Sequence, residues 1–142
     1  MPQPSDLLRK VSEYLSPEER KLVVVFGSSA IALHGVQLGR DVNDLDLFVS
    51  EATFAQIAAR FPVKTKPGGD EEVSYINPCE DVEILKSFPG VTFENVVTHA
   101  FPTLTSGGFL VGALDDVKRW KAAQGREKDF NDIKAIDRHV QP

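Results

Sequence analysis

Apolar positions along the chain follow three patterns that predict different elements. Residues 21–26, KLVVVF, form a continuous β-branched and aromatic run, which is typical of a strand buried on both faces. Residues 44–50, DLDLFVS, alternate strictly, which is typical of a strand with two unlike faces. Residues 5–15 place their leucines near one face of a helix that Ser5 can cap. The pattern therefore mixes strands and helices from the start of the chain.

The rest of the chain continues this mixture. Helices are expected over residues 28–35, 50–61, about 93–100, about 113–124 and 127–140, strands over 73–77 and 81–86, and a hairpin or two short strand pieces around Ser106, Gly107 and Gly108. Interleaved elements predict an α/β (α+β) fold with a mixed central β-sheet, flanking helices and a C-terminal helical pair. A length of 142 residues is that of one ordinary domain, so residues 1–142 are expected to form a single domain.

Composition narrows the classes of function. A hydrophobic content of 42% and a charged content of 26% are ordinary globular values. The net charge of −5 argues against a protein that coats itself in nucleic acid. From Asp115 onward, however, seven Lys and Arg face six Asp and Glu. The C-terminal segment is therefore the relatively basic part, where a phosphate-binding surface is expected.

Targeting and metal-binding signals are sparse. Residues 1–15 lack the apolar core of a signal peptide, and no apolar run approaches the roughly 20 residues that span a bilayer, so a cytoplasmic protein without a membrane partner is expected. Cys79 is the only cysteine, and the three histidines lie far apart. These facts argue against a cysteine-rich or histidine-rich zinc site.

Two aspartates stand at the start of the alternating strand. Asp44 and Asp46 point to the same side as Phe48, with Cα atoms roughly 6.5–7 Å apart. Carboxylates are costly to bury, so this pair needs either water or a cation. Hard oxygen ligands favour Mg²⁺ or Mn²⁺. The alternative is a solvated strand face that merely keeps an edge soluble.

A glycine and two serines favour the cation. Gly27, Ser28 and Ser29 follow a buried strand and open a helix, an arrangement that binds anions because glycine admits a phosphate, free N–H groups point at it, and serine adds a donor. A phosphate cradle beside metal-binding carboxylates predicts a site for a nucleoside triphosphate.

A third carboxylate is expected on the strand over residues 81–86. Asp81 and Glu83 are both candidates at positions i and i+2, so either both or neither should face the pair. Glu83 is preferred because IL follows it as LF follows Asp46. Ordinary exposed strand charges remain the alternative.

The last two helices place charges on inward stripes. Lys121 shares a stripe with Leu114 and Val117, and Asp129 shares one with the isoleucines of the final helix. Such groups are costly unless each meets a partner or a ligand. An ion pair between the helices, a lysine that extends to solvent, and a lysine that reaches nucleotide phosphates all remain open.

Together these segments resemble the nucleotidyltransferase superfamily with the DNA polymerase β-like fold. The resemblance rests on FGSSAIALHG, DLDLFV and DVEIL, and on VKRWKAAQGREKDFNDI, which is similar to the lysine-rich C-terminal helix of small members. It covers roughly residues 21–135. It is closest to the minimal bacterial group that includes antibiotic nucleotidyltransferases and toxin-type enzymes of abortive-infection systems.

The resemblance implies roles for individual residues. Asp44, Asp46 and Glu83 would be the catalytic residues and would bind Mg²⁺ or Mn²⁺, with Glu83 in the third acidic position, where the family more often has aspartate. The residues implied to bind the nucleotide are Gly27, Ser28, Ser29, Arg40, Lys121, Arg126 and Lys128, with Asp129 positioning one of the cations.

Two functions follow as expectations. The first is Mg²⁺-dependent transfer of an NMP from an NTP to the hydroxyl of a tRNA, a protein or a small molecule, with release of pyrophosphate. The second is a nucleotide-binding or protein-binding module without turnover, such as a toxin–antitoxin component with a cognate antitoxin. The first is the main expectation and the second is the alternative, whose best support is the glutamate at the third acidic position.

Overall fold

The structure is a computed structural model that describes residues 4–20, 23–68, 71–88, 91–102 and 109–140. Its helices are α1 (Pro4–Val11), α2 (Pro17–Arg20), α3 (Gly27–Leu33), α4 (Glu51–Ala58), α5 (Phe93–His99), α6 (Leu114–Gln124) and α7 (Glu127–Val140). Its strands are β1 (Val23–Phe26), β2 (Leu45–Val49), β3 (Lys64–Gly68), β4 (Glu71–Ile76), β5 (Val82–Leu85), β6 (Ser87–Phe88), β7 (Val91–Thr92) and β8 (Leu110–Val111).

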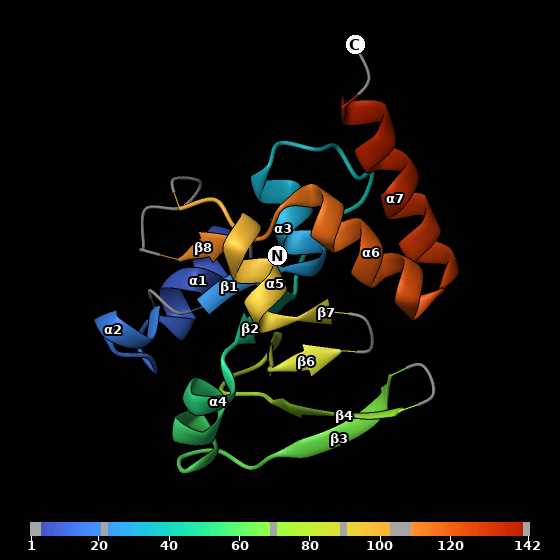
Figure 1. The fold of residues 1–142 in the computed structure, drawn as a ribbon. Coiled ribbons are helices and arrows are strands. Elements are labelled where there is room, and N and C mark those ends of the chain that lie inside the picture. Colours follow the sequence, from blue (N-terminus) through green and yellow to red (C-terminus); the bar gives the residue numbers. More distant parts are fainter. Residues whose placement is uncertain (1–3, 21–22, 69–70, 89–90, 103–108, 141–142) are drawn as a thin grey trace.

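Six strands form one sheet in the order β3-β4-β5-β2-β1-β8, and β6 and β7 form a small hairpin. Strand β2 pairs antiparallel with β1 and parallel with β5, while β1 pairs parallel with β8. Helices α6 and α7 lie side by side, with α6 packed against α3, and the β3–β4 hairpin lies at the other end of the molecule (Figure 1). The predicted mixed sheet and C-terminal helical pair are confirmed.

The core explains why the two central strands are so apolar. Every residue of β1 is fully buried, as the uninterrupted apolar run predicts. In β2, both faces are buried, and Asp46 is the one partly exposed residue. Phe48 lies on the Asp46 side and is covered there by Phe26 and Trp120, with ring centroids 4.9 and 6.2 Å away. Only the end of β2 that carries Asp46 therefore opens to solvent.

Several expected boundaries differ from the structure. The first helix ends at Val11 instead of reaching Leu15, which is nevertheless buried. Strand β3 was not expected, because its sequence KTKPG is mostly exposed and carries no apolar alternation. The tip of the expected hairpin at 106–108 lies outside the described residues, but Phe101 and Val111 form an antiparallel bridge on either side of it. Ser50 caps α4 as predicted, since its side chain accepts a hydrogen bond from Thr53 N at 3.1 Å.

Among the described helices, none is both long enough and apolar enough to cross a bilayer.

Candidate active site

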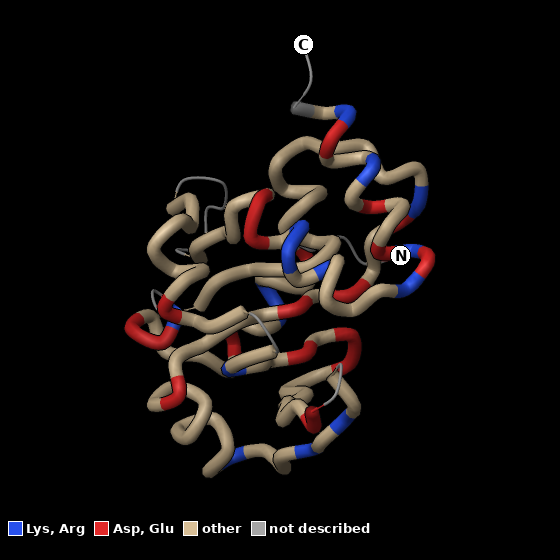
Figure 2. Tube along the Cα trace, turned by 45° about the vertical axis from the view of Figure 1, so that its right-hand side comes forward, with Lys and Arg blue, Asp and Glu red and all other residues tan. Residues whose placement is uncertain are grey.

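A small polar cleft lies where α3, β2, β5 and the α6–α7 pair meet. Its volume is ≈ 80 Å³, and it is lined by Ser28, Asp44, Asp46, Lys66, Glu83, Trp120, Lys121, Gln124, Arg126 and Lys128. The lining combines residues from β2, β3, β5 and both C-terminal helices. Acidic and basic positions are interleaved along the two helices near the C-terminus (Figure 2). Most of the residues named from the sequence are thus brought together.

The acidic side of the cleft is formed by neighbouring parallel strands. Asp46 on β2 stands opposite Glu83 on β5, and the exposed Asp44 precedes β2. Burial raises the pKa of Asp46 to about 8, helped by the charges of Glu83 and Asp44 and by a hydrogen bond with Glu83, and opposed by Lys66. Burial and the two neighbouring carboxylates therefore both favour the protonated form of Asp46.

Asp81 and Glu83 do not behave alike. Asp81 lies in the turn before β5 with φ of 66°, is exposed, and uses its backbone carbonyl to accept a hydrogen bond from Leu45 N at 2.8 Å. The expectation that both or neither would face the aspartates is wrong, because the strand alternation does not extend through a left-handed turn residue. Glu83 alone of the two lines the cleft.

Lys66 is a site residue that the sequence did not reveal. Its Nζ lies 2.6 Å from Glu83 Oε1, and it lies 5.2 Å from the centroid of the Tyr75 ring. The lysine reaches Glu83 from β3, across β4. Its local sequence carries no signal for this role, since a lysine on a polar edge strand is normally a solubilising residue.

Gly27 and Ser29 hold the end of β1 against the start of β2. Gly27 has φ of +64°, and a Cβ built on it would stand 2.5 Å from Asp46 Oδ2. Ser29 Oγ donates a hydrogen bond to the backbone carbonyl of Asp44. These two residues therefore position the aspartates, and only Ser28 of the glycine-serine motif lines the cleft itself.

A buried polar network forms the opposite wall. Lys121 Nζ donates to Ser28 Oγ at 2.9 Å and lies 2.9 Å from Asp132 Oδ2 and 3.4 Å from Asp129 Oδ1. Lys121, Asp129 and Asp132 are almost fully buried. The interhelical ion pair expected as one alternative is present, and Lys121 also lines the cleft.

Asp132 is the second residue that sequence reasoning missed. It accepts hydrogen bonds from Arg40 at 2.7 Å and from Ser28 Oγ at 3.2 Å, besides its contact with Lys121. The available signal was its position three residues after Asp129 on α7, which places both carboxylates on one helix face.

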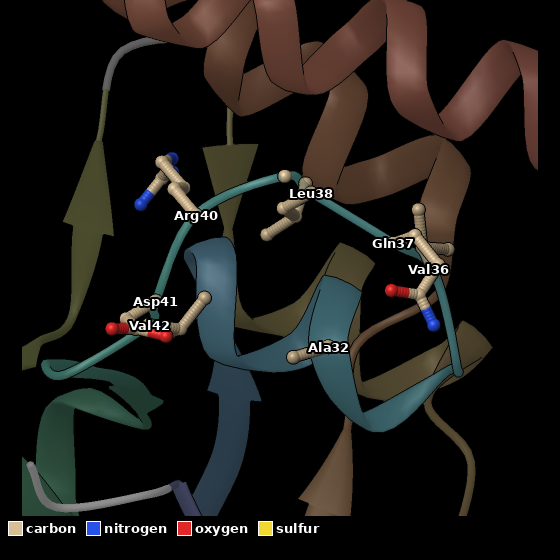
Figure 3. Close-up of a pocket in the computed structure, with 8 residues that line it drawn as sticks. Ala32, Val36, Gln37, Leu38, Arg40, Asp41 and Val42 are labelled. Carbon is tan, nitrogen blue, oxygen red and sulfur yellow. The ribbon is translucent and has the colours of Figure 1, made fainter.

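Arg40 does not line the cleft. It lies in the loop between α3 and β2, where its Nη2 donates to Ser28 Oγ at 2.9 Å and to Asp132. This loop surrounds a separate open pocket of ≈ 360 Å³ (Figure 3). The structure therefore places Arg40 behind Ser28, as a partner of the buried network.

The mouth of the cleft carries Arg126 and Lys128. Arg126 donates from Nε to Asp129 Oδ2 at 2.7 Å, and this hydrogen bond, more than the charges of Asp129, Asp46 and Asp44, raises its pKa. Burial raises the pKa of Asp129, but the hydrogen bonds from Arg126 and the charge of Lys121 outweigh it, so the pKa is lowered overall. Asp129 therefore holds two cations, as the sequence suggested for one.

The carboxylates of the cleft are oxygen ligands of the kind that a hard divalent cation prefers, but they do not already stand at the spacing of an ion site. Asp44, Asp46 and Glu83 offer carboxylate oxygens, which Mg²⁺ and Mn²⁺ prefer, and burial together with the neighbouring carboxylates raises the pKa of Asp46. Within the described residues, however, no three His, Cys, Asp or Glu side chains already stand at the spacing of an ion site. A cation held here would complete its shell with water or phosphate oxygens.

Comparisons with known proteins identify the fold. A provisionally assigned nucleotidyltransferase from Thermotoga maritima, TM1012, matches with a TM-score of 0.60 and 19% identity over 94% of this chain and 91% of its own. The Megavirus polyadenylate synthase matches with a TM-score of 0.50 and 15% identity over 97% of this chain but 33% of its own. No family model and no curated protein sequence matches the chain. The chain has the nucleotidyltransferase fold, and the resemblance to toxin-type members stays a prediction.

Proposed function

We propose that this protein is a Mg²⁺-dependent nucleotidyltransferase that moves an NMP from an NTP to an acceptor hydroxyl and releases pyrophosphate. One observation carries the proposal: the Asp46 and Glu83 carboxylates face Ser28 and Lys121 across a single cleft. A cluster of acids beside a cluster of cations suits a ligand with both a metal and phosphates. The fold shared with a provisionally assigned nucleotidyltransferase supports this proposal.

The acidic side would hold the cation and receive the proton. Asp44 and Asp46 would bind Mg²⁺, which supplies charge neutralisation for the triphosphate and a lower pKa for the acceptor hydroxyl. Glu83 would accept the hydroxyl proton. A bond then forms from the acceptor oxygen to the α-phosphorus as the bond to pyrophosphate breaks.

The basic side would orient the leaving pyrophosphate. The Lys121 ammonium would be the donor, held in place by its hydrogen bond to Ser28 Oγ at 2.9 Å and by the buried carboxylates of Asp129 and Asp132 behind it. Arg126 and Lys128 add positive charge at the mouth. Donors held in place before the substrate arrives stabilise developing charge more than donors that must reorganise.

The size of the cleft limits what enters it. Its ≈ 80 Å³ is well below the roughly 300–1,000 Å³ typical of pockets that enclose a whole small-molecule ligand. Only the phosphates and the cation would sit inside, with the ribose and the base outside. We therefore expect weak selectivity for the base unless the acceptor or a partner completes the site.

Label transfer tests the proposal. The protein is incubated with each α-labelled NTP, Mg²⁺ or Mn²⁺, and total tRNA or cell lysate as acceptor. Label should appear on the acceptor with wild-type protein and be lost with Asp46→Asn, while the exposed Asp41→Asn, outside the cleft, should behave as wild type. Equal transfer by Asp46→Asn would refute the proposed metal role.

A binding module is the second candidate, supported by Lys66. Because Lys66 already engages Glu83 at 2.6 Å, and no three-ligand cage is preformed within the described part of the chain, the site would hold nucleotide without turning it over. This alternative predicts a rise in melting temperature with MgATP but no pyrophosphate release with any acceptor. Its partner would be a protein, such as a cognate antitoxin, which co-purification from the native host would reveal.

A further inference from the structure

Lys66 brings a positive charge into the carboxylate cluster from two strands away. In the sheet order β3-β4-β5, its side chain crosses β4 to reach Glu83 on β5, and the Nζ–Oε1 distance is 2.6 Å. Neither partner is freely solvated, since 31% of the Lys66 side chain and 19% of the Glu83 side chain are exposed. The contact therefore belongs to the cleft wall.

The neighbouring lysine shows that this placement is specific to one position. Lys64 lies two residues earlier on the same face of β3, but its Nζ donates to the amide oxygen of Asn77 at 3.2 Å. Lys66 instead extends past the Tyr75 ring, which lies 5.2 Å from its Nζ and attracts a cation. Only the second of the two lysines is aimed at a cleft carboxylate.

Charge counting shows what this ammonium changes. Of the cations that line the cleft, Lys121 and Arg126 pair with carboxylates of α7, whereas Lys66 pairs with Glu83 of the acidic cluster. The cluster of Asp44, Asp46 and Glu83 carries three negative charges when ionised, and its contact with Lys66 offsets one of them. One divalent cation balances the remaining two charges, whereas a second divalent cation would leave two positive charges in excess before nucleotide binds. Like charges separated by a few ångströms inside a cleft repel strongly.

We propose that Lys66 takes the place of a second divalent cation beside Glu83, so that the cluster binds a single divalent cation through Asp44 and Asp46. The inference rests on the metal-binding part of the proposed function. It makes Lys66 a tethered cation that sets the metal stoichiometry of the site, and makes Glu83 the ligand of an ammonium.

Manganese titration without nucleotide tests this directly. Free Mn²⁺ is followed by electron paramagnetic resonance, and only ions lost in Asp46→Asn are counted as cleft ions. Wild type should bind one such ion and Lys66→Met should bind two. In Lys66→Met, the first ion should also bind on the order of tenfold more tightly, because a nearby positive charge has been removed. The partly exposed position of Lys66 makes this variant tolerable to the fold.

Two further variants serve as controls. Lys64→Met removes a lysine from the same strand face without touching a carboxylate, and should bind one ion with wild-type affinity. Lys66→Arg keeps the positive charge and should also bind one ion.

The results separate this inference from the proposed function. Two cleft ions in wild type, no cleft ion in any variant, or identical binding by wild type and Lys66→Met would each overturn it. If wild type transfers nucleotide while Lys66→Met shows unchanged stoichiometry, the inference alone fails. If the stoichiometry changes as expected but no nucleotide is transferred, the transferase proposal alone fails.

Discussion

The side chain of Asp46 occupies the space that a Cβ on Gly27 would need. A Cβ on Gly27 would stand 2.5 Å from Asp46 Oδ2 and 2.9 Å from a ring atom of Trp120, and Gly27 has φ of +64°. Glycine is therefore required at this position for two reasons: the backbone has a positive φ, and there is no room for a Cβ. The end of β1 can approach the acidic end of β2 only because the side chain is absent.

Gly27→Ala should destabilise the protein and disable the cleft. The left-handed conformation alone costs roughly 1–2 kcal/mol for a residue with a Cβ, and the clash with Asp46 adds to it. Gly35→Ala is a matched control, because Gly35 has φ of +86° but nothing lies within 4 Å of its Cβ position. Urea unfolding should show a larger loss for Gly27→Ala, and only that variant should lose stabilisation by MgATP. Equal losses of unfolding free energy in Gly27→Ala and Gly35→Ala would mean that the close approach between residue 27 and Asp46 does not affect stability.

Asp46→Asn should stabilise the metal-free protein at high pH. The pKa of Asp46 is about 8 in the folded protein against an ordinary 3.8. The folded chain keeps a proton there that the unfolded chain releases. The contribution of the protonated Asp46 carboxyl group to the free energy of unfolding is therefore fully present below pH 3.8 and is lost as pH rises through about 8. Asparagine does not ionise, so the Asp46→Asn variant does not lose this stability as pH rises. The melting temperature of Asp46→Asn relative to wild type should therefore increase with pH.

The size of this effect is measurable. A difference of only about 1 kcal/mol moves the melting temperature of a domain of this size by roughly 2–8 °C. Thermal melts in a chelating buffer between about pH 5 and pH 9 would measure it, with the exposed Asp41→Asn as control. A constant offset between the Asp46→Asn and wild-type curves would show that the Asp46 carboxylate is not protonated in the fold.

Lys121→Met should be far more damaging than Lys118→Met. Lys121 is buried against Asp129 and Asp132, so its removal leaves buried carboxylates short of a partner, at a cost of roughly 3–5 kcal/mol. Lys118 pairs with Asp137 across the same two helices, but both side chains are partly exposed, so its loss should cost about 1 kcal/mol or less. Chemical denaturation of both variants checks the difference. Similar costs would show that the buried network adds no more than a surface pair.

Trp120 should report nucleotide binding by fluorescence. It is the only tryptophan in the sequence, lines the cleft, and packs against Phe26, Phe48 and Phe88. A charged ligand in an ≈ 80 Å³ cleft must lie close to the indole, so its emission should change with saturation as MgATP is added. Lys121→Met should weaken the response. Binding detected by calorimetry without any change in emission would place the nucleotide elsewhere.

The local sequence pattern predicted those parts of the site that lie within a single strand or helix. Gly27 follows an apolar run that is buried as β1, Asp46 lies in β2, and Asp44 stands directly before that strand. Ser50 caps α4, because a serine before a helix offers its oxygen to a free N–H whatever the rest of the fold does. Such features follow from backbone geometry within a few residues, which the sequence specifies directly.

Contacts between distant elements were decided by the tertiary structure. The role of Lys66 depends on β3 lying two strands from β5, and the roles of Arg40 and Asp132 depend on α7 packing beside Ser28. Asp81 leaves the cluster because a turn residue with φ of 66° interrupts the alternation.

The amino-acid sequence by itself determined which side chains stand at the end of each strand and which face of each helix is apolar, because period and conformational preference are local. The packing of strands and helices decided which charges meet. In a salt bridge such as Lys66–Glu83, the sequence around each residue does not indicate which residue it will pair with. The pairing could therefore be identified only once the strand order and the packing of the helices were known.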